Sequence, residues 1–303
     1  MSAPSRSFFE FEPPDFTTDG RDWPNRAASH FVSAGGVDWH YQDMGEGPVL
    51  LLLHGTAGAT HSFRDLGPLM ARHFRVIIPD LPGHGFTGAV DTHRLSLPAM
   101  ARAITDLLAS LQATPVLVAG HSAGAAILVR MALDKTITPR AIIGLNAALL
   151  PFRGLAQHLF PPIARLLTLN PVVPRVFAWS ADTAAVRRLI EKTGSTLDPV
   201  GLDCYRRLIA RSGHVAAALG MMARWDLDPI VAALPGLETR LDLIVGTNDL
   251  AVPPGDAMII RRRRPATTVI RLQGLGHLAH EEKPDLVADH LLAIAREAGA
   301  LAD

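Results

Sequence analysis

The stretch VAGHSAGA, residues 118–125, places Ser122 between Gly120 and Gly124 at the end of a short apolar run. The apolar run is typical of a buried strand, and residues 123–133 are typical of a helix. The pentapeptide matches G-x-S-x-G, whose glycines permit close approach of strand and helix around a serine in a strained backbone conformation. The motif predicts either a nucleophile or a tight structural turn, and loops elsewhere in the chain decide between them.

Strands and helices alternate along most of the sequence. Several apolar runs lack polar alternation, which predicts strands buried on both faces. A pair of runs flanks Gly35-Gly36 and predicts a hairpin. Strands separated by helices predict an α/β fold with a mainly parallel, eight-stranded sheet flanked by helices. The predicted strands are residues 29–34, 37–43, 49–53, 74–79, 116–119, 141–145, 241–246 and 268–272, and the main helices are residues 63–72, 97–111, 123–133 and 284–298.

The chain divides into three predicted parts. Residues 1–28 are rich in Pro, Asp and Phe without periodicity, and they predict an extended N-terminal arm. Residues 29–148 and 226–303 contain all eight strands and form the predicted core. Residues 149–225 contain helical stretches interrupted by prolines, and they predict a helical cap inserted after the sixth strand. Such a cap covers the carboxyl edge of the sheet, where folds of this kind place their sites.

Composition narrows the function. The 303 residues contain 29 Lys and Arg against 29 Asp and Glu, so no global field favours nucleic acid. No apolar run approaches the roughly 18 residues of a transmembrane helix, and the first residues lack a secretory signal. The single cysteine, Cys204, excludes an internal disulfide and a Cys-based zinc site. Metal-ligand spacing and a G-x-G-x-x-G motif are also lacking, so we expect a cytoplasmic protein without metal or cofactor.

A serine hydroxyl needs a base, and the base needs an acid to orient it. With this motif the chain order is serine, acid, histidine. Asp249 lies just past the seventh strand and is the predicted acid, whereas Asn146, at the alternative position after the sixth strand, lacks a charge. His277 follows the last strand directly and is the predicted base. His280 lies three residues on, which favours a supporting or core role.

The oxyanion of an acyl-transfer reaction needs two N–H donors. One predicted donor is the backbone N–H of Ala123, directly after Ser122. The second comes from the loop after the third strand, with Thr56 as first choice and Ala57 as runner-up. His54, at the start of this loop, is predicted to brace it by hydrogen bonds.

Two further residues are candidates for the site, and one run of charges is not. His121 precedes the serine and is a candidate supporting residue. Phe86, in a glycine-rich loop after the fourth strand, is a candidate for lining the substrate pocket. Residues 261–264, four consecutive arginines, predict a solvated face rather than an anion site.

Taken in chain order, His54-Gly55, DLPGHG at 80–85, the Ser122 turn and Asp249 followed by His277 resemble the α/β-hydrolase superfamily over residues 29–294. The resemblance implies Ser122 as nucleophile, His277 as base and Asp249 as acid. The serine separates the chain from the haloalkane dehalogenase and epoxide hydrolase branches, which have aspartate there.

A narrower resemblance is carried by DWPNR (22–26), LLLLHGTAGAT (50–60), HSFRD (61–65) and GHLAHEE (276–282). These segments are similar to the magnesium chelatase accessory proteins of bacteriochlorophyll biosynthesis. That resemblance implies a photosynthetic bacterium, a tetrapyrrole-related role at the step inserting magnesium into protoporphyrin IX, and association with magnesium chelatase. It names a pathway and leaves the substrate open.

Two hypotheses follow. The first is a serine hydrolase acting on an ester or related acyl substrate. The second is a non-catalytic tetrapyrrole-binding or chelatase-assisting protein, motivated by that resemblance and an apolar cap bearing arginines. The cap residues that motivate this second hypothesis are Leu149, Leu150, Phe152, Phe160, Leu166, Leu167, Phe177 and Trp179, with Arg153, Arg165 and Arg175. A lyase or cofactor-free peroxidase is a third hypothesis, since related folds use the same triad.

Overall fold

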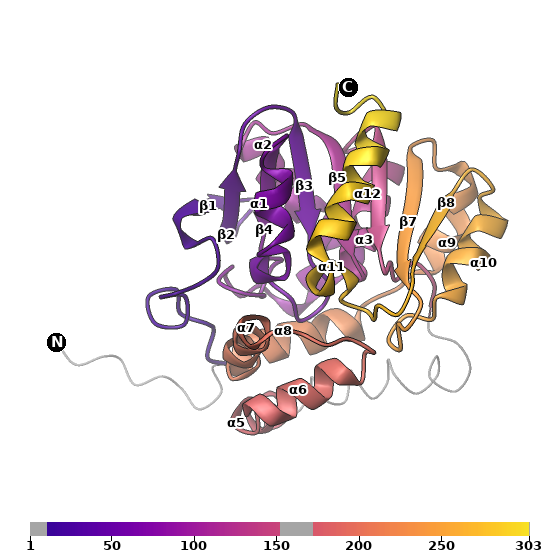
Figure 1. The fold of residues 1–303 in the computed structure, drawn as a ribbon. Coiled ribbons are helices and arrows are strands. Elements are labelled where there is room, and N and C mark those ends of the chain that lie inside the picture. The colour runs from indigo at the N-terminus through magenta and orange to yellow at the C-terminus, as the bar shows by residue number, and fades with distance from the viewer. Residues whose placement is uncertain (1–10, 152–171, 303) are drawn as a thin grey trace.

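A computed structural model of the chain describes residues 11–151 and 172–302. Eight strands form one sheet in the order β1-β2-β4-β3-β5-β6-β7-β8 (Figure 1). The pairs β1–β2 and β2–β4 are antiparallel and the other five pairs are parallel, which confirms the predicted sheet. The strands are β1 (Ser29–Ala34), β2 (Val37–Met44), β3 (Val49–Leu53), β4 (Arg75–Pro79), β5 (Pro115–His121), β6 (Ala141–Leu145), β7 (Arg240–Gly246) and β8 (Thr268–Leu272).

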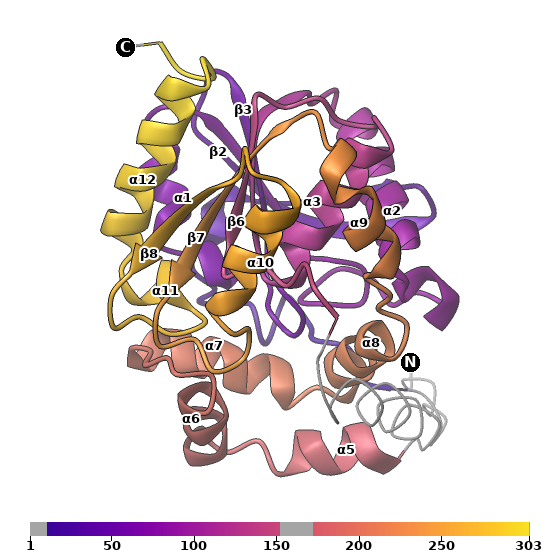
Figure 2. The same ribbon diagram turned by 90° about the vertical axis from the view of Figure 1, so that its right-hand side faces the viewer.

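Helices cover both faces of the sheet (Figure 2). One face carries α1 (Leu66–Met70), α11 (Ala279–Glu282) and α12 (Pro284–Glu297). The other carries α2 (Leu97–Ser110), α3 (Ala123–Leu133), α9 (Asp228–Ala233) and α10 (Gly255–Arg263). The short helices η1 (Arg26–Ala28), η2 (Thr60–Phe63), η3 (Thr92–Leu95) and η4 (Leu234–Gly236) lie in the connections.

The central strand β3 shows why the apolar runs lack alternation. Leu51 and Leu53 join the core cluster beneath α2 and α3, while Leu50 and Leu52 join the cluster beneath α1 and α12. All four side chains are fully buried. Because both faces of this strand are covered, neither set of alternate positions can be polar.

Among the described residues, the cap predicted after the sixth strand contains α5 (Val172–Trp179), α6 (Thr183–Glu191), α7 (Pro199–Ile209) and α8 (Ser212–Ala223). They lie beyond the carboxyl ends of the parallel strands (Figure 1). The arginine-bearing part of the predicted cap that includes Phe152, Arg153, Phe160, Arg165, Leu166 and Leu167 lies outside the described residues.

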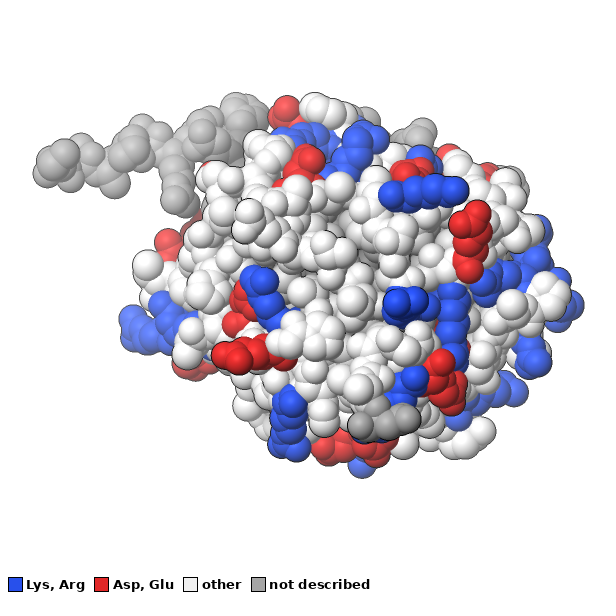
Figure 3. All heavy atoms as spheres, turned by 90° about the horizontal axis from the view of Figure 1, so that it is seen from above, with Lys and Arg blue, Asp and Glu red and all other residues white. Residues whose placement is uncertain are grey.

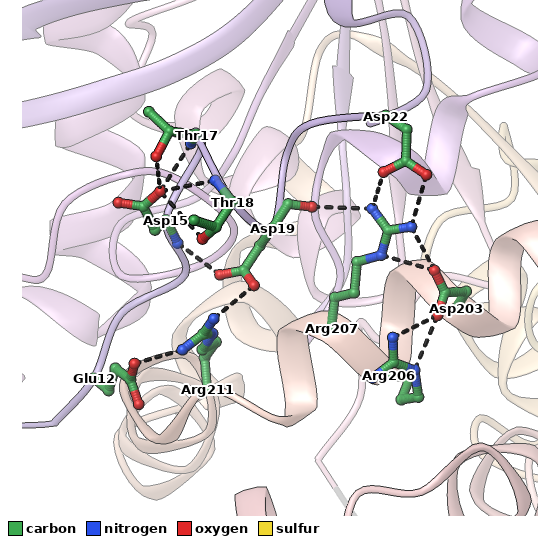
Figure 4. Close-up of polar contacts among 10 residues, drawn as sticks. All are labelled: Glu12, Asp15, Thr17, Thr18, Asp19, Asp22, Asp203, Arg206, Arg207 and Arg211. Carbon is green, nitrogen blue, oxygen red and sulfur yellow. Dashed lines mark hydrogen bonds and ion pairs between the residues drawn. The ribbon is translucent and has the colours of Figure 1, made fainter.

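The described part of the N-terminal arm is folded rather than extended. Asp15 Oδ1 accepts hydrogen bonds from the Thr17 and Thr18 N–H groups, which closes a turn. On both sides of the turn the arm contacts the cap, through Arg207 of α7 and through Arg211, which directly precedes α8 (Figure 4). Composition does not predict this arrangement, because the hydrogen-bond partners of the arm lie about 190 residues away in sequence.

Two further expectations are corrected. The helix predicted over residues 63–72 is divided into η2 and α1, because Pro68 fits only the first turn of a helix. In the arginine run, Arg261 to Arg263 are exposed, but Arg264 is buried and donates to the carbonyls of Leu237 and Thr239.

The outer surface has little charge segregation at the end of the molecule away from the cap. Seen from that end, Lys and Arg side chains lie among Asp and Glu side chains (Figure 3). Among the described residues, none of the helices has the length and apolar character needed to cross a bilayer.

Candidate active site

Ser122 lies on a sharp turn between β5 and α3. Its φ of 50° and ψ of −115° are unusual for a residue with a side chain. A Cβ at Gly120 would lie 2.5 Å from the Ala125 nitrogen, and one at Gly124 would lie 2.3 Å from the Leu53 oxygen. Only glycine fits these positions, so the two glycines allow the helix to pack directly on the strands and present the serine at the sheet edge.

Asp249 and His277 meet at the same edge, after β7 and β8. His277 Nδ1 lies 2.8 Å from Asp249 Oδ2, and the two side chains are only 10% and 1% exposed. The other carboxylate oxygen accepts from the N–H groups of Ala251 and Val252, each at 2.8 Å. Because an ionised carboxylate only accepts hydrogen bonds, the ring nitrogen that faces it, Nδ1 of His277, carries the hydrogen in the neutral ring. The other ring nitrogen, Nε2, is then an acceptor.

Asn146, the first residue after β6, supports the candidate acid, a role that was not predicted from the sequence. It is buried, has a φ of 46°, and donates from Nδ2 to Asp249 Oδ2 at 2.7 Å and to the Gly276 carbonyl at 3.2 Å. Asparagine is unsuited to be the acid, but its amide is suited to hold one. The sequence signal available for this role was the position of Asn146 directly after a strand, at the carboxyl edge of the sheet.

His121 links the serine turn to the His277 loop. Its Nε2 donates to the His277 carbonyl at 3.0 Å, and the two rings have centroids 4.6 Å apart. Burial holds the pKa of His121 well below its usual range, and the nearby His280 and His277 rings act in the same direction. His121 therefore stays neutral and serves as a packed spacer next to Ser122.

His280 is a second buried histidine near the candidate base. Its Nε2 lies 2.9 Å from Ser62 Oγ, and its ring packs 4.6 Å from the His121 ring. Burial, followed by the neighbouring His277 and Arg64, lowers the pKa of His280 to about 3. These contacts make His280 a neighbour of the candidate base rather than a competing partner for Asp249.

The loop after β3 lies against the serine turn. A Cβ at Gly55 would lie 3.0 Å from Ser122 Cβ, so this loop and the turn are in contact. Within the part of the chain that the structure describes, the backbone N–H groups of Thr56 and Ala123 donate to no other residue. Ala57, the runner-up donor, has a φ of 62°.

His54 braces this loop. Its Nδ1 donates to the Gly55 carbonyl at 2.7 Å, and its Nε2 accepts from the Leu81 N–H at 2.9 Å. Burial lowers the pKa of His54, which keeps the ring in the neutral form that these two opposite bonds require. The ring thereby ties the loop after β3 to the loop after β4.

A second brace comes from the cap and has no sequence motif. His214 of α8 accepts from the Gly85 N–H at Nδ1 and donates from Nε2 to the Ala57 carbonyl, both at 3.1 Å. Burial lowers the pKa of His214 to about 4, so the ring is neutral at pH 7. Thr56 Oγ1 also contacts Met221 Sδ of α8 at 3.6 Å, so the cap supports the loop at two points.

Phe86 belongs to an aromatic cluster beneath the arm. Its ring packs edge-on against Trp23, Phe16 and His40, with centroids 4.8 to 5.2 Å apart. These contacts join the arm to the core, and the lining of a substrate pocket by Phe86 stays a prediction. Among the described residues, no group of three or more His, Cys, Asp or Glu side chains is placed to hold a metal ion.

The chain belongs to the alpha/beta hydrolase family, whose sequence pattern matches residues 50–290. It is 41% identical over 274 residues to the "Magnesium-chelatase 30 kDa subunit" of Rhodobacter capsulatus, covering 89% of this chain and 95% of that protein. It is 25% identical to the uncharacterised hydrolase YugF of Bacillus subtilis, covering 83% and 91% of the two chains. The fold resembles the ligand-free epoxide hydrolase CorEH with a TM-score of 0.77 at 20% identity, over 89% of this chain and 98% of that one.

Proposed function

We propose that the protein is a serine hydrolase with Ser122, Asp249 and His277 as its catalytic triad, acting on an ester or related acyl substrate. The observation that carries the proposal is the buried Asp249–His277 pair at the sheet edge where the glycine-flanked Ser122 turn also lies. The relation to the magnesium-chelatase subunit of Rhodobacter capsulatus supports a substrate linked to the magnesium chelatase step, and the resemblance carried by residues 22–26, 50–65 and 276–282 implies that this step belongs to bacteriochlorophyll biosynthesis. A cytoplasmic location is part of the proposal.

In this mechanism His277 Nε2 takes the proton of the Ser122 hydroxyl as Oγ attacks the acyl carbon. Asp249 stabilises the imidazolium that forms and keeps the ring in its productive orientation. The oxyanion lies between the Thr56 and Ala123 N–H groups, and the N-terminus of α3 favours negative charge there. His277 then returns the proton to the leaving group, and water activated by the same ring releases the acyl group from Ser122.

Labelling with a fluorophosphonate, followed by intact-mass measurement, tests the proposal directly. We expect one adduct on the native protein, none on Ser122→Ala, and full labelling of Ser110→Ala, which changes an exposed serine of α2. A native protein without an adduct, or an adduct that persists on Ser122→Ala, refutes the triad.

A second candidate is a non-catalytic protein that binds a tetrapyrrole or assists magnesium chelatase. The name of the 41% identical relative favours it, and so do Phe177 and Trp179, which are 50% and 91% exposed on α5. Pigment formation that survives Ser122→Ala in the living cell, together with tight protoporphyrin binding by the purified protein, would support this candidate. Pigment formation lost on Ser122→Ala supports catalysis.

A further inference from the structure

The connection between α6 and α7 of the cap lies against both loops that carry the predicted acid and base. The carbonyl oxygen of Thr193 accepts from the Leu250 N–H at 3.1 Å and from the His277 N–H at 3.3 Å. Leu250 directly follows Asp249 in the chain. A single cap oxygen therefore joins the acid loop to the histidine itself.

The next two cap residues extend this contact. Asn248, directly before the acid, donates from Nδ2 to the Gly194 carbonyl at 2.9 Å. The N–H of Leu278, directly after the base, donates to Ser195 Oγ at 2.8 Å, and Ser195 is only 2% exposed. Three consecutive cap residues thus bind the chain around both predicted triad positions.

Glycines make this approach possible. Gly194 has a φ of 84°, and a Cβ there would lie 1.9 Å from the backbone carbonyl oxygen of Asn248. From the other side, a Cβ at Gly276 would lie 2.3 Å from the Gly194 carbonyl carbon and oxygen. The main chain of the cap packs directly on the main chain of the loops here. No flexible side chain lies between them, so the distance between the cap and the loops is fixed by backbone contacts.

The connection is itself fixed on the cap side. Thr193 Oγ1 donates to the Ile190 carbonyl at 2.6 Å, and the Gly194 N–H donates to the Glu191 carbonyl at 2.9 Å, which ends α6. Leu278 is packed into the small apolar cluster of the cap rather than into the main core. That cluster consists of Val186, Ile190, Leu197, Leu202, Tyr205 and Leu278.

We infer that residues 193–195 are a positioning segment, which sets the placement of Asp249 relative to His277 and couples it to the seating of the cap. The inference rests on the proposed function for its catalytic consequence only. Lifting α6 and α7 from the core breaks the four hydrogen bonds to the two loops and withdraws the cluster around Leu278. Alignment of the acid–base pair and seating of the cap are therefore one event.

Ser195→Ala tests the segment, because it removes the acceptor of a buried N–H while leaving the backbone contacts. Ser195→Thr keeps the hydroxyl, and Ser180→Ala, at the exposed end of α5, is the matched control. We expect faster amide hydrogen exchange in residues 247–252 and 275–279 of Ser195→Ala. We also expect fluorophosphonate labelling slowed by about 10-fold to 100-fold, the scale of small misplacements at an active site. Ser195→Thr and the control should behave as the native protein does.

A second variant guards against loss of folding. Asn248→Ala changes an exposed side chain and should accelerate exchange in residues 247–252 with an unchanged unfolding midpoint. The low-field proton resonance of the His277–Asp249 hydrogen bond should weaken in both variants, which a purely structural change elsewhere would not cause. Exchange and resonance equal to those of Ser180→Ala overturn the inference. Failure of the native protein to label refutes the proposed function alone, because exchange still tests the segment.

Discussion

The buried pair of Arg64 and Glu281 provides the sharpest stability prediction. Arg64 follows η2, Glu281 lies on α11, and their side chains are 5% and 0% exposed. Glu281 also accepts from Ser62 Oγ at 2.9 Å and from the Tyr205 hydroxyl at 2.8 Å. Burial raises the pKa of Glu281, although Arg64 and these hydrogen bonds oppose the shift. The arginine is therefore the only cation in the described contacts that compensates this carboxylate.

Arg64→Met removes the cation and keeps the volume of the side chain. A buried charge that loses its partner typically costs about 3–5 kcal/mol, so we expect a loss of that size in the free energy of unfolding at pH 7. For a chain of this length the corresponding fall in melting temperature is about 2 °C per kcal/mol. The pKa of Glu281 rises further in the variant, above its value in the unfolded chain. The loss is thus largest above that raised pKa and shrinks as the pH falls through it.

Urea unfolding of four proteins measures this effect. The double variant Arg64→Met/Glu281→Gln, which keeps an acceptor for Ser62 and Tyr205 without a charge, should recover at least half of the loss. Arg130→Met is the matched control, because its pair with Asp134 lies on the surface of α3 and is worth less than about 1 kcal/mol. A loss in Arg64→Met no greater than in the control, or a double variant no more stable than the single one, refutes the reasoning.

Three other predictions concern single side chains. Burial lowers the pKa of His214 to about 4, so between pH 6.5 and pH 4 the unfolded chain binds a proton that the folded chain excludes. As the pH falls through this range, the free energy of unfolding therefore decreases by about 1.4 kcal/mol per pH unit. His214→Gln should remove that part of the slope in urea titrations over this range. Asn146→Gly keeps the positive φ and removes a donor to Asp249. Fluorophosphonate labelling at pH 7 should therefore slow by about 10-fold to 100-fold, the equivalent of one hydrogen bond to a charged group. Arg207→Ala breaks an ion pair to Asp22, which is 69% exposed, so it should cost less than about 1 kcal/mol while amide exchange in residues 15–24 becomes faster.

The sheet and the strand ends were predictable because local chemistry determines them. Runs such as residues 49–53 are apolar at every position, and this occurs when both faces of a strand are covered. Parallel strands end at a common edge, so Ser122, Asp249 and His277 could be predicted at that edge from three separate loops. The glycines beside Ser122 carried the same information, since their close contacts with Ala125 and Leu53 exclude a side chain.

The supports of the site were not predictable in this way. His214 and Ser195 lie in the cap, and their partners are backbone groups more than 80 residues away in sequence. A histidine or serine in a helical region has no pattern that distinguishes such a bond from an exposed side chain. Arg264 shows the same limit, because its neighbours in the run are exposed, whereas its own guanidinium is buried and donates to the carbonyls of Leu237 and Thr239.

The conformation of Ser122 bears on the choice between catalysis and binding. A residue with a Cβ is strained at a φ of 50°, and glycine would relieve that strain. Stability alone would therefore favour glycine at position 122, as it does at the two flanking positions where a Cβ has no room. The hydroxyl at 122 is held at a cost to the fold, at the same sheet edge as a buried carboxylate that accepts from three backbone or amide groups as well as from His277. A surface that only binds a ligand has no need of a strained serine, whereas acyl transfer requires its oxygen at this point, and this asymmetry is the physical reason to prefer the hydrolase.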